Sequence, residues 1–358
     1  TWKGYEIVKR IAVIGAGGTG VAMSALLASR GHSVCLADTS CNQAVLDGAV
    51  RAGVLRTKGT AVCEGRPELI TTDLGEAVRR SELIVCCTIS NRDEEIASAI
   101  APWLEEHHAV LIGAGNGGSI VYHRVLEACG KGGILTAETA GNFFPARVTG
   151  EGEATIGLPL APKGVTAFPP SRAAEAAQRF AEVWELTPCS SMIEALFNGP
   201  NLICHSAGCV LNLSAIGRSG GNFNLFTDGL SEEMLNVTDA LWQEKARVYE
   251  AMGCTPSPAP RGMLAGVMDP QDESYRYFRM MDGPGSITHR YITEDVPNLT
   301  CFFLSIARAA GVSAPLFEGI VGLLSAAAGR DFYGEGRTLE NLGLAHLGRE
   351  ELIRFFHA

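Results

Sequence analysis

The chain has 358 residues, of which 46% are hydrophobic and 19% charged, and its formal net charge is −10. This length suits two domains, and the composition is typical of a globular protein with a sizeable core rather than of a disordered or fibrous one. Lysine and arginine form no block, so the acidic balance argues against a nucleic-acid partner and favours small molecules as partners.

The eleven cysteines include no C-x-x-C pair, so the sequence predicts neither a zinc site nor a thioredoxin-type motif. We therefore expect no metal, and reduced thiols in a cytoplasmic protein. Lys9-Arg10 and the following apolar stretch imitate a secretory signal, but four glycines weaken that stretch as an inserting helix. No other segment has the length and apolarity of a membrane span, so no membrane partner is expected.

Short apolar runs alternate with helical patterns in the first half of the chain. The runs are rich in β-branched residues and bounded by Gly or polar turns, which predicts buried strands. The predicted strands are 10–14, 33–37, 83–87, 110–113, 133–136, 155–158 and 165–167, and the predicted helices are 21–30, 94–100, 120–128 and 172–184. This alternation predicts an α/β Rossmann domain over residues 1–187, with a doubly wound, mainly parallel sheet.

The periodicity changes after residue 187. Segments 200–216, 231–252, 299–310 and 315–329 all have helical patterns, and no strand pattern lies between them. Residues 188–358 are therefore expected to form a mainly α-helical C-terminal domain that carries the substrate and catalytic groups. The cleft between two such domains is the expected site.

A glycine-rich turn follows the first predicted strand. Gly15, Gly17 and Gly20 form a G-x-G-x-x-G pattern that also contains Gly18 and Thr19. The first glycine permits the tight turn, the second lets a pyrophosphate approach the backbone, and the third lets the helix pack on the strand. A lone pattern of this kind also fits a turn without a ligand, but its place between a strand and a helix favours a dinucleotide site.

Asp38 ends the second predicted strand, about 20 residues beyond the turn. An acid at this position accepts a hydrogen bond from the adenosine ribose and repels a 2′-phosphate. NAD is therefore favoured over NADP, while Thr39 and Ser40 beside the acid leave NADP open.

A second glycine cluster covers residues 113–118 and includes Asn116. It fits a turn that needs positive φ angles. Because it ends a strand on the edge where ligands collect in such sheets, it is also a candidate substrate loop. Glu138 and Thr139 end the next strand on the same edge.

Histidine is the usual proton carrier of a nicotinamide enzyme. Five of the eight histidines lie among charged residues or turns and are expected at the surface, and His123 is expected on an outer helix; these five are His32, His107, His108, His346 and His357. His205 lies in an apolar helical run one turn after Asn201, a spacing that fits a core histidine as well as a catalytic one. His289 is the other candidate.

Arg290 and Asp295 lie in the segment HRYITEDVP. By spacing alone this is a polar loop with a helix cap or part of a site, and the composition does not decide between them.

The motifs resemble those of the octopine/nopaline dehydrogenase family nearly from end to end. The similar features are the glycine turn, Glu138-Thr139, the N-x-x-x-H spacing of Asn201 and His205, the R-Y-x-x-E-D-V run from Arg290, and EGRTLENLGL near the C-terminus. Such a resemblance implies an opine dehydrogenase, which condenses an amino acid with a 2-oxo acid such as pyruvate and reduces the imine with NAD(P)H.

The resemblance also implies roles for individual residues. His205 would be the catalytic histidine and Asp295 its carboxylate partner, and Arg290 would bind a substrate carboxylate. Asn201 would position substrate, Thr139 would contact the oxo acid, and Glu138 would lie near the amino-acid side chain. A homodimer is compatible with the family.

Two places depart from the family pattern. Ser206 follows the histidine where proline is usual, and Asn298-Leu-Thr-Cys301-Phe replaces a Gly-Leu-Val-Pro turn. Both would border the amino-acid pocket, so the amine partner stays open. The alternatives are a simple 2-oxo or 2-hydroxy acid dehydrogenase of the ketopantoate or glycerol-phosphate type, and a non-catalytic NAD-binding protein.

Overall fold

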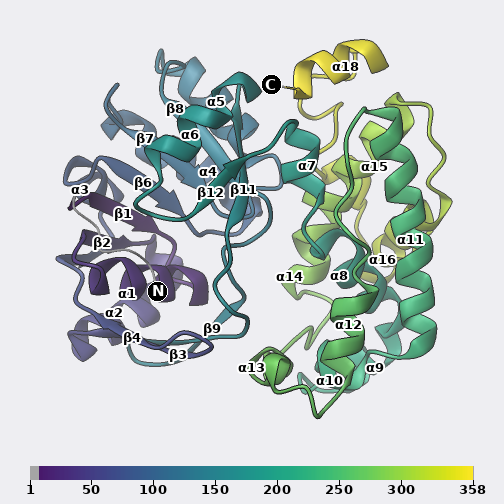
Figure 1. The fold of residues 1–358 in the computed structure, drawn as a ribbon, viewed down its shortest axis with the longest axis horizontal. Helices are drawn as coiled ribbons and strands as arrows, with labels where there is room; N and C mark the ends of the chain where they lie inside the picture. Colours follow the sequence, from purple (N-terminus) through teal and green to yellow (C-terminus); the bar gives the residue numbers. More distant parts are fainter. Residues whose placement is uncertain (1–7, 358) are drawn as a thin grey trace. The chain divides into compact units, whose positions relative to one another are not determined.

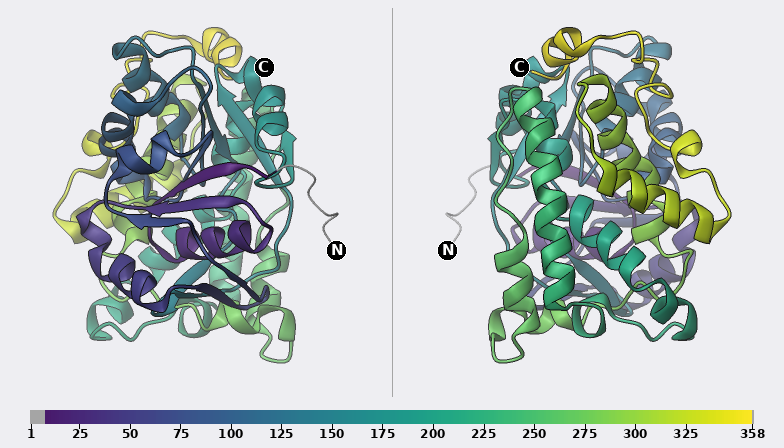
Figure 2. Two further views of the ribbon diagram at one scale, coloured as in Figure 1. Left: turned by 90° about the vertical axis from the view of Figure 1, so that its left-hand side faces the viewer. Right: turned by 90° about the vertical axis from the view of Figure 1, so that its right-hand side faces the viewer.

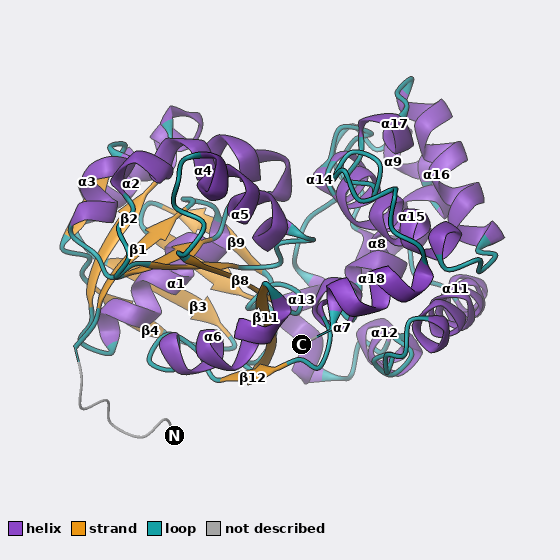
Figure 3. Cartoon of the chain, turned by 90° about the horizontal axis from the view of Figure 1, so that it is seen from above, coloured by secondary structure: helices purple, strands orange, loops and turns teal. Residues whose placement is uncertain are grey.

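A computed structural model describes residues 8–357, and the chain divides after Cys189 into two compact units. Figure 3 shows the strands in the first unit and helices throughout the second. The predicted α/β domain followed by a helical domain is confirmed, and each unit is described by itself below. Within the described residues, every helix is too short or too polar to cross a bilayer.

Strand order in the first unit is that of a Rossmann fold. In chain order the strands are β1 Arg10–Ile14, β2 Ser33–Ala37, β3 Leu55–Gly59, β4 Cys63–Gly65, β5 Leu69–Thr71, β6 Leu83–Cys86, β7 Ala109–Ile112, β8 Leu135–Thr139, β9 Ala146–Gly150, β10 Glu153–Ile156, β11 Lys163–Phe168 and β12 Leu186–Pro188. In the described chain the main sheet has the order β12-β11-β8-β7-β6-β1-β2-β5. All neighbouring strands from β8 to β5 in this order pair in parallel. Only β11 is antiparallel to its neighbour β8, while β12 is parallel to β11.

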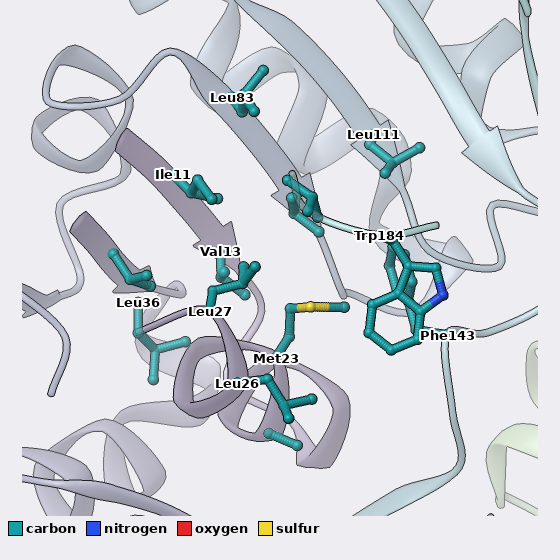
Figure 4. Close-up of a cluster of buried hydrophobic side chains, with 14 of the residues drawn as sticks. Ile11, Val13, Met23, Leu26, Leu27, Leu36, Leu83, Leu111, Phe143 and Trp184 are labelled. Atoms are coloured by element: carbon teal, nitrogen blue, oxygen red, sulfur yellow. The ribbon is translucent and has the colours of Figure 1, made fainter. Parts of the chain in front are cut away.

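Helices cover both faces of this sheet (Figure 1). In chain order they are α1 Gly18–Ser29, α2 Gln43–Ala52, α3 Leu74–Arg79, α4 Asp93–Ile100, α5 Gly118–Ala128 and α6 Ala173–Arg179. Because successive side chains of a strand point to opposite faces, β1 contributes Ile11 and Val13 to one core cluster and Ala12 and Ile14 to the other. Figure 4 shows Val13, with other residues of the first cluster, above α1.

Helix α1 is buried almost all round, from Gly20 to Leu27. It contacts β1 and β2 of the main sheet and also a smaller sheet of order β4-β3-β10-β9. A Cβ at Gly65 on β4 would lie 2.3 Å from the Ala25 carbonyl oxygen, so only glycine allows this close approach. A helix that is apolar on every side is expected where it lies between two sheets.

Helices α7 to α18 form the second unit. They are α7 Met192–Phe197, α8 Asn201–Leu211, α9 Leu213–Arg218, α10 Leu225–Asp228, α11 Glu232–Ala251, α12 Arg261–Met268, α13 Arg276–Arg279, α14 Arg290–Thr293, α15 Cys301–Ala309, α16 Pro315–Ala328, α17 Phe332–Glu335 and α18 Arg349–Phe356. The long helix α11 contacts α8, α12 and α16, and the right-hand view of Figure 2 shows it from outside.

Several predicted helices have different bounds. The helix predicted over 172–184 ends at Arg179, because Phe180 and Trp184 leave it to fill the core of the first unit. The helix predicted over 200–216 breaks at Asn212, whose Nδ2 donates to the carbonyls of Gly208 and Gly229 at 2.9 and 3.2 Å. The helix predicted over 299–310 begins as a π-helix, Val296–Thr300.

The expected exposure of two histidines is wrong. His32 and His108 are 5% and 4% exposed. Their Nδ1 atoms accept backbone N–H groups of Lys9 and Glu105, at 3.2 and 2.8 Å, and burial lowers the pKa of both rings. Histidine is intermediate in burial preference, so polar neighbours in sequence do not decide its place.

Candidate active site

The glycine turn between β1 and α1 is closely packed at three of its four glycines, and a Cβ at Gly18 would lie 2.5 Å from the Ala146 carbonyl oxygen. Gly15 has φ +111°, and a Cβ there would lie 2.8 Å from the Cys87 carbonyl carbon. A Cβ at Gly20 would lie 1.7 Å from the Gly15 carbonyl oxygen, so the strand and the helix meet backbone to backbone. These glycines are required by the fold itself.

Gly17 is different, because a Cβ there would meet nothing within 4 Å. It precedes the first residue of α1, where no side chain caps the helix and the first turn holds no acid. Unsatisfied N–H groups at such a terminus bind anions, and the open space beside Gly17 admits a phosphate to the backbone. The turn therefore fits the pyrophosphate of a dinucleotide, with Gly18 and Thr19 in the first turn of the helix.

Asp38 follows β2 and is 1% exposed. Its Oδ2 accepts the N–H of Ala16 in the glycine turn and Nδ2 of Asn42, both at 2.7 Å. Its Oδ1 accepts the Thr39 N–H at 2.7 Å and Nη1 of Arg92 at 3.0 Å. Burial alone would raise the pKa of Asp38, but these hydrogen bonds outweigh it and lower the pKa.

Arg92 is a residue that sequence reasoning missed. It lies just before α4, 54 positions from Asp38, and also donates to Thr39 Oγ1 at 2.6 Å and to Glu95 at 2.8 Å. No spacing in the sequence indicates this pairing, because it depends on the strand order of the sheet, in which β1 lies between β6 and β2. The guanidinium of Arg92 thus lies beside Asp38, the acid that was expected to favour NAD over NADP.

The second glycine cluster forms a loop between β7 and α5. Ala114 and Asn116 adopt positive φ angles of 56° and 48°, which non-glycine residues rarely do. Such strained residues persist where the surroundings fix them, and they gather at functional sites. Asn116 is half-buried, and its Nδ2 lies 3.5 Å from the Ser90 hydroxyl.

The carboxylate of Glu138 holds this loop in place. The residue is 1% exposed, one carboxylate oxygen accepts the Gly117 N–H at 2.9 Å, and the other accepts the hydroxyl and N–H of Ser119 at 2.5 and 3.3 Å. Thr139 Oγ1 accepts the Ala114 N–H at 3.2 Å and donates to the Gly141 carbonyl at 2.7 Å. The predicted substrate residues of the first unit are therefore connected: Asn116 lies in the loop, and Glu138 and Thr139 on β8 bind its backbone.

In the second unit, His205 and Asp295 meet although 90 positions separate them. His205 Nδ1 lies 2.6 Å from Asp295 Oδ2, and the two residues are 7% and 2% exposed. A carboxylate at this distance makes Nδ1 the donor, fixes the tautomer and favours the imidazolium form. The structure thus brings together the two residues that spacing alone left undecided.

Arg290 begins α14 and pairs with Glu294, Nη1 to Oε2 at 2.8 Å. Burial would lower the pKa of Arg290, but the charges of Glu294 and Asp295 raise it further, so the guanidinium stays charged. The side chain is 37% exposed, whereas Glu294 is buried. Glu294 was part of the quoted motif but received no role from the sequence.

Asp295 immediately precedes the π-helix Val296–Thr300, in which Pro297 lies. Single-turn π segments are rare and often occur at functional sites. The C-terminal EGR motif contacts this π-helix, because the N–H of Arg337 donates to the Pro297 carbonyl at 2.9 Å. A Cβ at Gly336 would lie 2.4 Å from that same oxygen, which explains the glycine of the EGR sequence.

Asn201 is half-buried at the first turn of α8 and lies one turn before His205. The predicted residues therefore fall into two sets. The first unit holds Gly15, Gly17, Gly18, Thr19, Gly20, Asp38, Asn116, Glu138 and Thr139, and the second holds Asn201, His205, Arg290 and Asp295. A Rossmann unit with an open glycine turn, followed by a helical unit with a buried histidine–carboxylate pair, defines a two-domain NAD(P)-dependent dehydrogenase.

Comparison with known proteins agrees with this class. Residues 188–328 match the family model described as NAD/NADP octopine/nopaline dehydrogenase, alpha-helical domain. The chain is 26% identical over 357 residues to an opine dehydrogenase of Arthrobacter sp. (strain 1C), which covers 95% of this chain and 96% of that protein. The second unit thus matches the helical domain of this family, and the chain is similar to an opine dehydrogenase over nearly its whole length, as its motifs indicated.

Solved structures share the fold. A structure of octopine dehydrogenase with NADH and L-arginine has a TM-score of 0.70 at 15% identity, covering 97% of this chain and 98% of that chain. Yersinopine dehydrogenase with bound NADP+ has a TM-score of 0.64 at 14% identity, covering 96% of this chain and 95% of that chain. At these identities the likeness establishes the architecture alone.

Proposed function

We propose that this protein is an opine dehydrogenase, which condenses an amino acid or another small amine with a 2-oxo acid such as pyruvate and reduces the product to an N-(1-carboxyalkyl) amino acid. The observation that carries the proposal is the buried His205–Asp295 pair, 2.6 Å apart, in the unit that matches the family's helical domain. Related octopine dehydrogenase structures that hold NADH with L-arginine, agmatine or pyruvate support the substrate classes.

The cofactor is a nicotinamide dinucleotide, and Gly17, Gly18 and Thr19 would hold its pyrophosphate. When bound, the reduced nicotinamide would supply the hydride. The anionic Asp38 favours NADH, and the adjacent Arg92 keeps NADPH open as a second cofactor.

The reaction balances as follows. The unprotonated amine adds to the carbonyl carbon of the oxo acid, the hydroxyl oxygen leaves as water after protonation, and the resulting imine takes up a hydride at carbon and a proton at nitrogen. In sum, amine, oxo acid, NADH and one proton give the secondary amine, NAD+ and water.

His205 would exchange the protons of these steps. Because Asp295 binds Nδ1, we assign this exchange to Nε2. The imidazolium protonates the departing oxygen, and the neutral ring then accepts a proton, so one residue serves in both directions.

The remaining residues would bind substrate. Glu294 holds Arg290 through Nη1, so the Nε–Nη2 edge of the same guanidinium is assigned to a substrate carboxylate. Asn201 and Thr139 are assigned to positioning the amine and the oxo acid, and Asn116 to the mouth of the second glycine loop. Glu138 supports that loop, because both of its oxygens accept hydrogen bonds from it.

We expect the enzyme to act in the cytoplasm as a monomer or a homodimer on small molecules. The alternative activity, simple reduction of a 2-oxo acid, differs in one measurable respect, because it needs no amine.

The test is NADH oxidation with pyruvate in the presence and absence of each of a panel of amino acids, with the product identified by mass. Amine-dependent oxidation and a product of the summed mass less one oxygen support the proposal. Oxidation that is indifferent to the amine would establish the simple reductase instead.

Replacing His205 by Ala should lower kcat by roughly 10²- to 10⁴-fold, the usual contribution of a general acid–base group, and leave NADH binding nearly unchanged. NADH binding is measured by fluorescence titration, so a folded but inactive variant is recognised. Full turnover in His205→Ala would remove the catalytic assignment.

A further inference from the structure

The imidazole of His205 is held on its face as well as at its edge. The ring of Tyr291 lies parallel to it, with centroids 3.5 Å apart and an interplanar angle of 17°. Tyr291 is 4% exposed and His205 is 7% exposed, so water has little access to the stack. Asp295 Oδ2 holds the edge of the same ring, at 2.6 Å from Nδ1.

Tyr291 is itself fixed by its neighbours. His289 precedes α14, its Nδ1 accepts the Tyr291 N–H at 3.3 Å, and its ring packs edge-on against the Tyr291 ring at 4.6 Å and 86°. A Cβ at Gly283 would lie 2.6 Å from His289 Nε2, so glycine leaves the room that His289 needs. The phenol ring therefore has a supported position rather than a loosely packed one.

Because Tyr291 and Asp295 both belong to the RYITED run, one segment of chain supplies both constraints. Tyr291 lies within α14 and Asp295 follows one turn later, just before the π-helix. Both α14 and the π-helix contact α8, which carries His205. A carboxylate stops the ring from sliding, and a stacked face stops it from rotating about its bond to Cβ.

We propose that Tyr291 is a positioning residue that fixes the plane of the His205 imidazole and stabilises its protonated form. This rests on the proposed function for its consequence in turnover, because His205 is the assigned proton carrier. The electron-rich face of a tyrosine attracts a cation, and the attraction strengthens where water is excluded. The stack thus favours the imidazolium in addition to Asp295.

Other ionisable groups lie on the elements that carry or contact His205, and two of them also contact the Tyr291 ring: the His289 ring at 4.6 Å and the Arg290 guanidinium at 5.7 Å from its centroid. On the elements packed against His205 they are Arg290 and Glu294 on α14, Glu244 and Lys245 on α11, Glu318 on α16, His289 before α14, and Cys204 and Cys209 on α8 itself. Since none of them is changed in the experiment below, a difference between variants reports the ring at position 291.

The experiment compares Tyr291→Phe, which keeps the aromatic face, with Tyr291→Leu and Tyr291→Met, which fill similar space without one. Phe278→Leu is the matched control, because Phe278 is a buried aromatic of the same unit that packs against the Phe226 ring. Circular dichroism and thermal melting establish which variants are folded, and two non-aromatic replacements ensure that one unfolded variant does not end the test.

We expect Tyr291→Phe to keep kcat within about threefold of the wild type. Tyr291→Leu and Tyr291→Met should lower kcat roughly 10- to 100-fold with the KM for NADH unchanged, since misplacing a catalytic group by about 1 Å costs on this order. The limb of the pH–rate profile that reports the imidazolium should move to lower pH in these two variants and stay in place in Tyr291→Phe. A loss of kcat no larger than that of Phe278→Leu overturns the proposal.

A second readout needs no turnover. The titration of the His205 ring is followed by NMR in histidine-labelled protein, with the resonance assigned by its absence in His205→Ala. A midpoint lower in Tyr291→Leu than in Tyr291→Phe supports the stack, and equal midpoints refute it. If the wild type shows no amine-dependent oxidation of NADH, the proposed function fails, and this titration still decides the role of Tyr291.

Discussion

Asp38 and Arg92 are the two residues that we expect to decide cofactor choice. The carboxylate accepts four N–H hydrogen bonds from its surroundings, one of them from the glycine turn, so it holds the turn as well as repelling negative charge. Arg92 neutralises part of that repulsion. A small change at either position therefore alters both the turn and the charge beside it.

Replacing Asp38 by Ser should raise the KM for NADH about tenfold or more, since losing a hydrogen bond to a charged group costs roughly 1.5–3 kcal/mol. The same change leaves Arg92 without its main buried anion and makes it available to the 2′-phosphate of NADPH. We expect kcat/KM to fall for NADH and to rise for NADPH, as measured by initial rates with each cofactor.

The double variant Asp38→Ser/Arg92→Ala should lose the gain with NADPH. Asp38→Asn is the matched control, because it keeps an oxygen acceptor for the Ala16 N–H but removes the charge. Equal losses with both cofactors in Asp38→Ser would show that the acid only supports the turn.

Ser206 is a buried residue of α8 at which the sequence departs from the family motif. It replaces the proline usual in the family and was expected beside the amino-acid pocket. Its hydroxyl donates to the Leu202 carbonyl at 2.7 Å, and the residue is fully buried within α8. A proline there would lose the helical N–H and crowd that same carbonyl, so serine keeps α8 regular.

At the scale of elements, the glycine turn contains glycines that backbone packing requires, Gly15 and Gly20, and one, Gly17, that packing does not require. Gly17→Ala should leave the melting temperature nearly unchanged, because its φ is −73° and the space beside it is open. It should still raise the KM for NADH about tenfold or more, because the new methyl group occupies the path of the phosphate.

Two other glycines make this comparison decisive. Gly133→Ala, also in open space, should change neither quantity. Gly20→Ala should lower the melting temperature by several degrees or more, since each kcal/mol lost shifts it by about 2–4 °C in a unit of this size. A fall in melting temperature for Gly17→Ala equal to that for Gly20→Ala would mean that the turn has only a structural role.

The elements with strong periodicity were predicted well. β1, β2 and α11 were predicted nearly to their ends because apolar alternation, the Ser231 cap and length all agree there. The small sheet β4-β3-β10-β9 was largely missed, since its short strands carry charged residues such as Arg56 and Glu153 on exposed edges. Its apolar face is buried because α1 packs on it.

The predicted site residues depended on the motifs of a family rather than on spacing. The approach of His205 to Asp295 and of Arg92 to Asp38 joins segments 90 and 54 positions apart, which local pattern cannot reveal. Tyr291 and Glu294 were part of a quoted motif, but their contacts depend on how α14 packs against α8. Long-range packing therefore decides what sequence periodicity leaves open.

At the scale of the whole molecule, a buried lysine makes stability depend on pH. Lys245 on α11 is 2% exposed, and burial lowers its pKa to about 7. Its Nζ donates to the Ser257 hydroxyl at 3.0 Å, and that hydroxyl donates to the Asn198 carbonyl just before α8. The lysine thus links α11 to the start of the helix that carries His205.

Between pH 7 and about 10.4, the usual lysine pKa, the unfolded chain holds a proton at Lys245 that the folded chain has released. The free energy of unfolding should therefore rise with pH in this window, by at most about 1.4 kcal/mol per unit, and the buried charge should destabilise the fold fully below it. Lys245→Met should flatten the dependence and raise stability most at pH 6.5.

Urea unfolding of the wild type and Lys245→Met at pH 6.5 and 9.5, followed by circular dichroism, measures this effect. Lys58→Met, at an exposed position of the first unit, is the matched control and should keep the wild-type dependence. An unchanged pH dependence in Lys245→Met would show that other groups cause it.

The division after Cys189 has a consequence for how such an enzyme diversifies. The residues assigned to proton transfer and its support, His205, Asp295 and Tyr291, are all encoded in one uninterrupted stretch, and the turn assigned to the dinucleotide is encoded in another. A crossover between related genes near codon 189 would therefore exchange a complete proton-transfer machinery at once. Changes in acid–base chemistry can then be inherited as a block while the first unit stays the same.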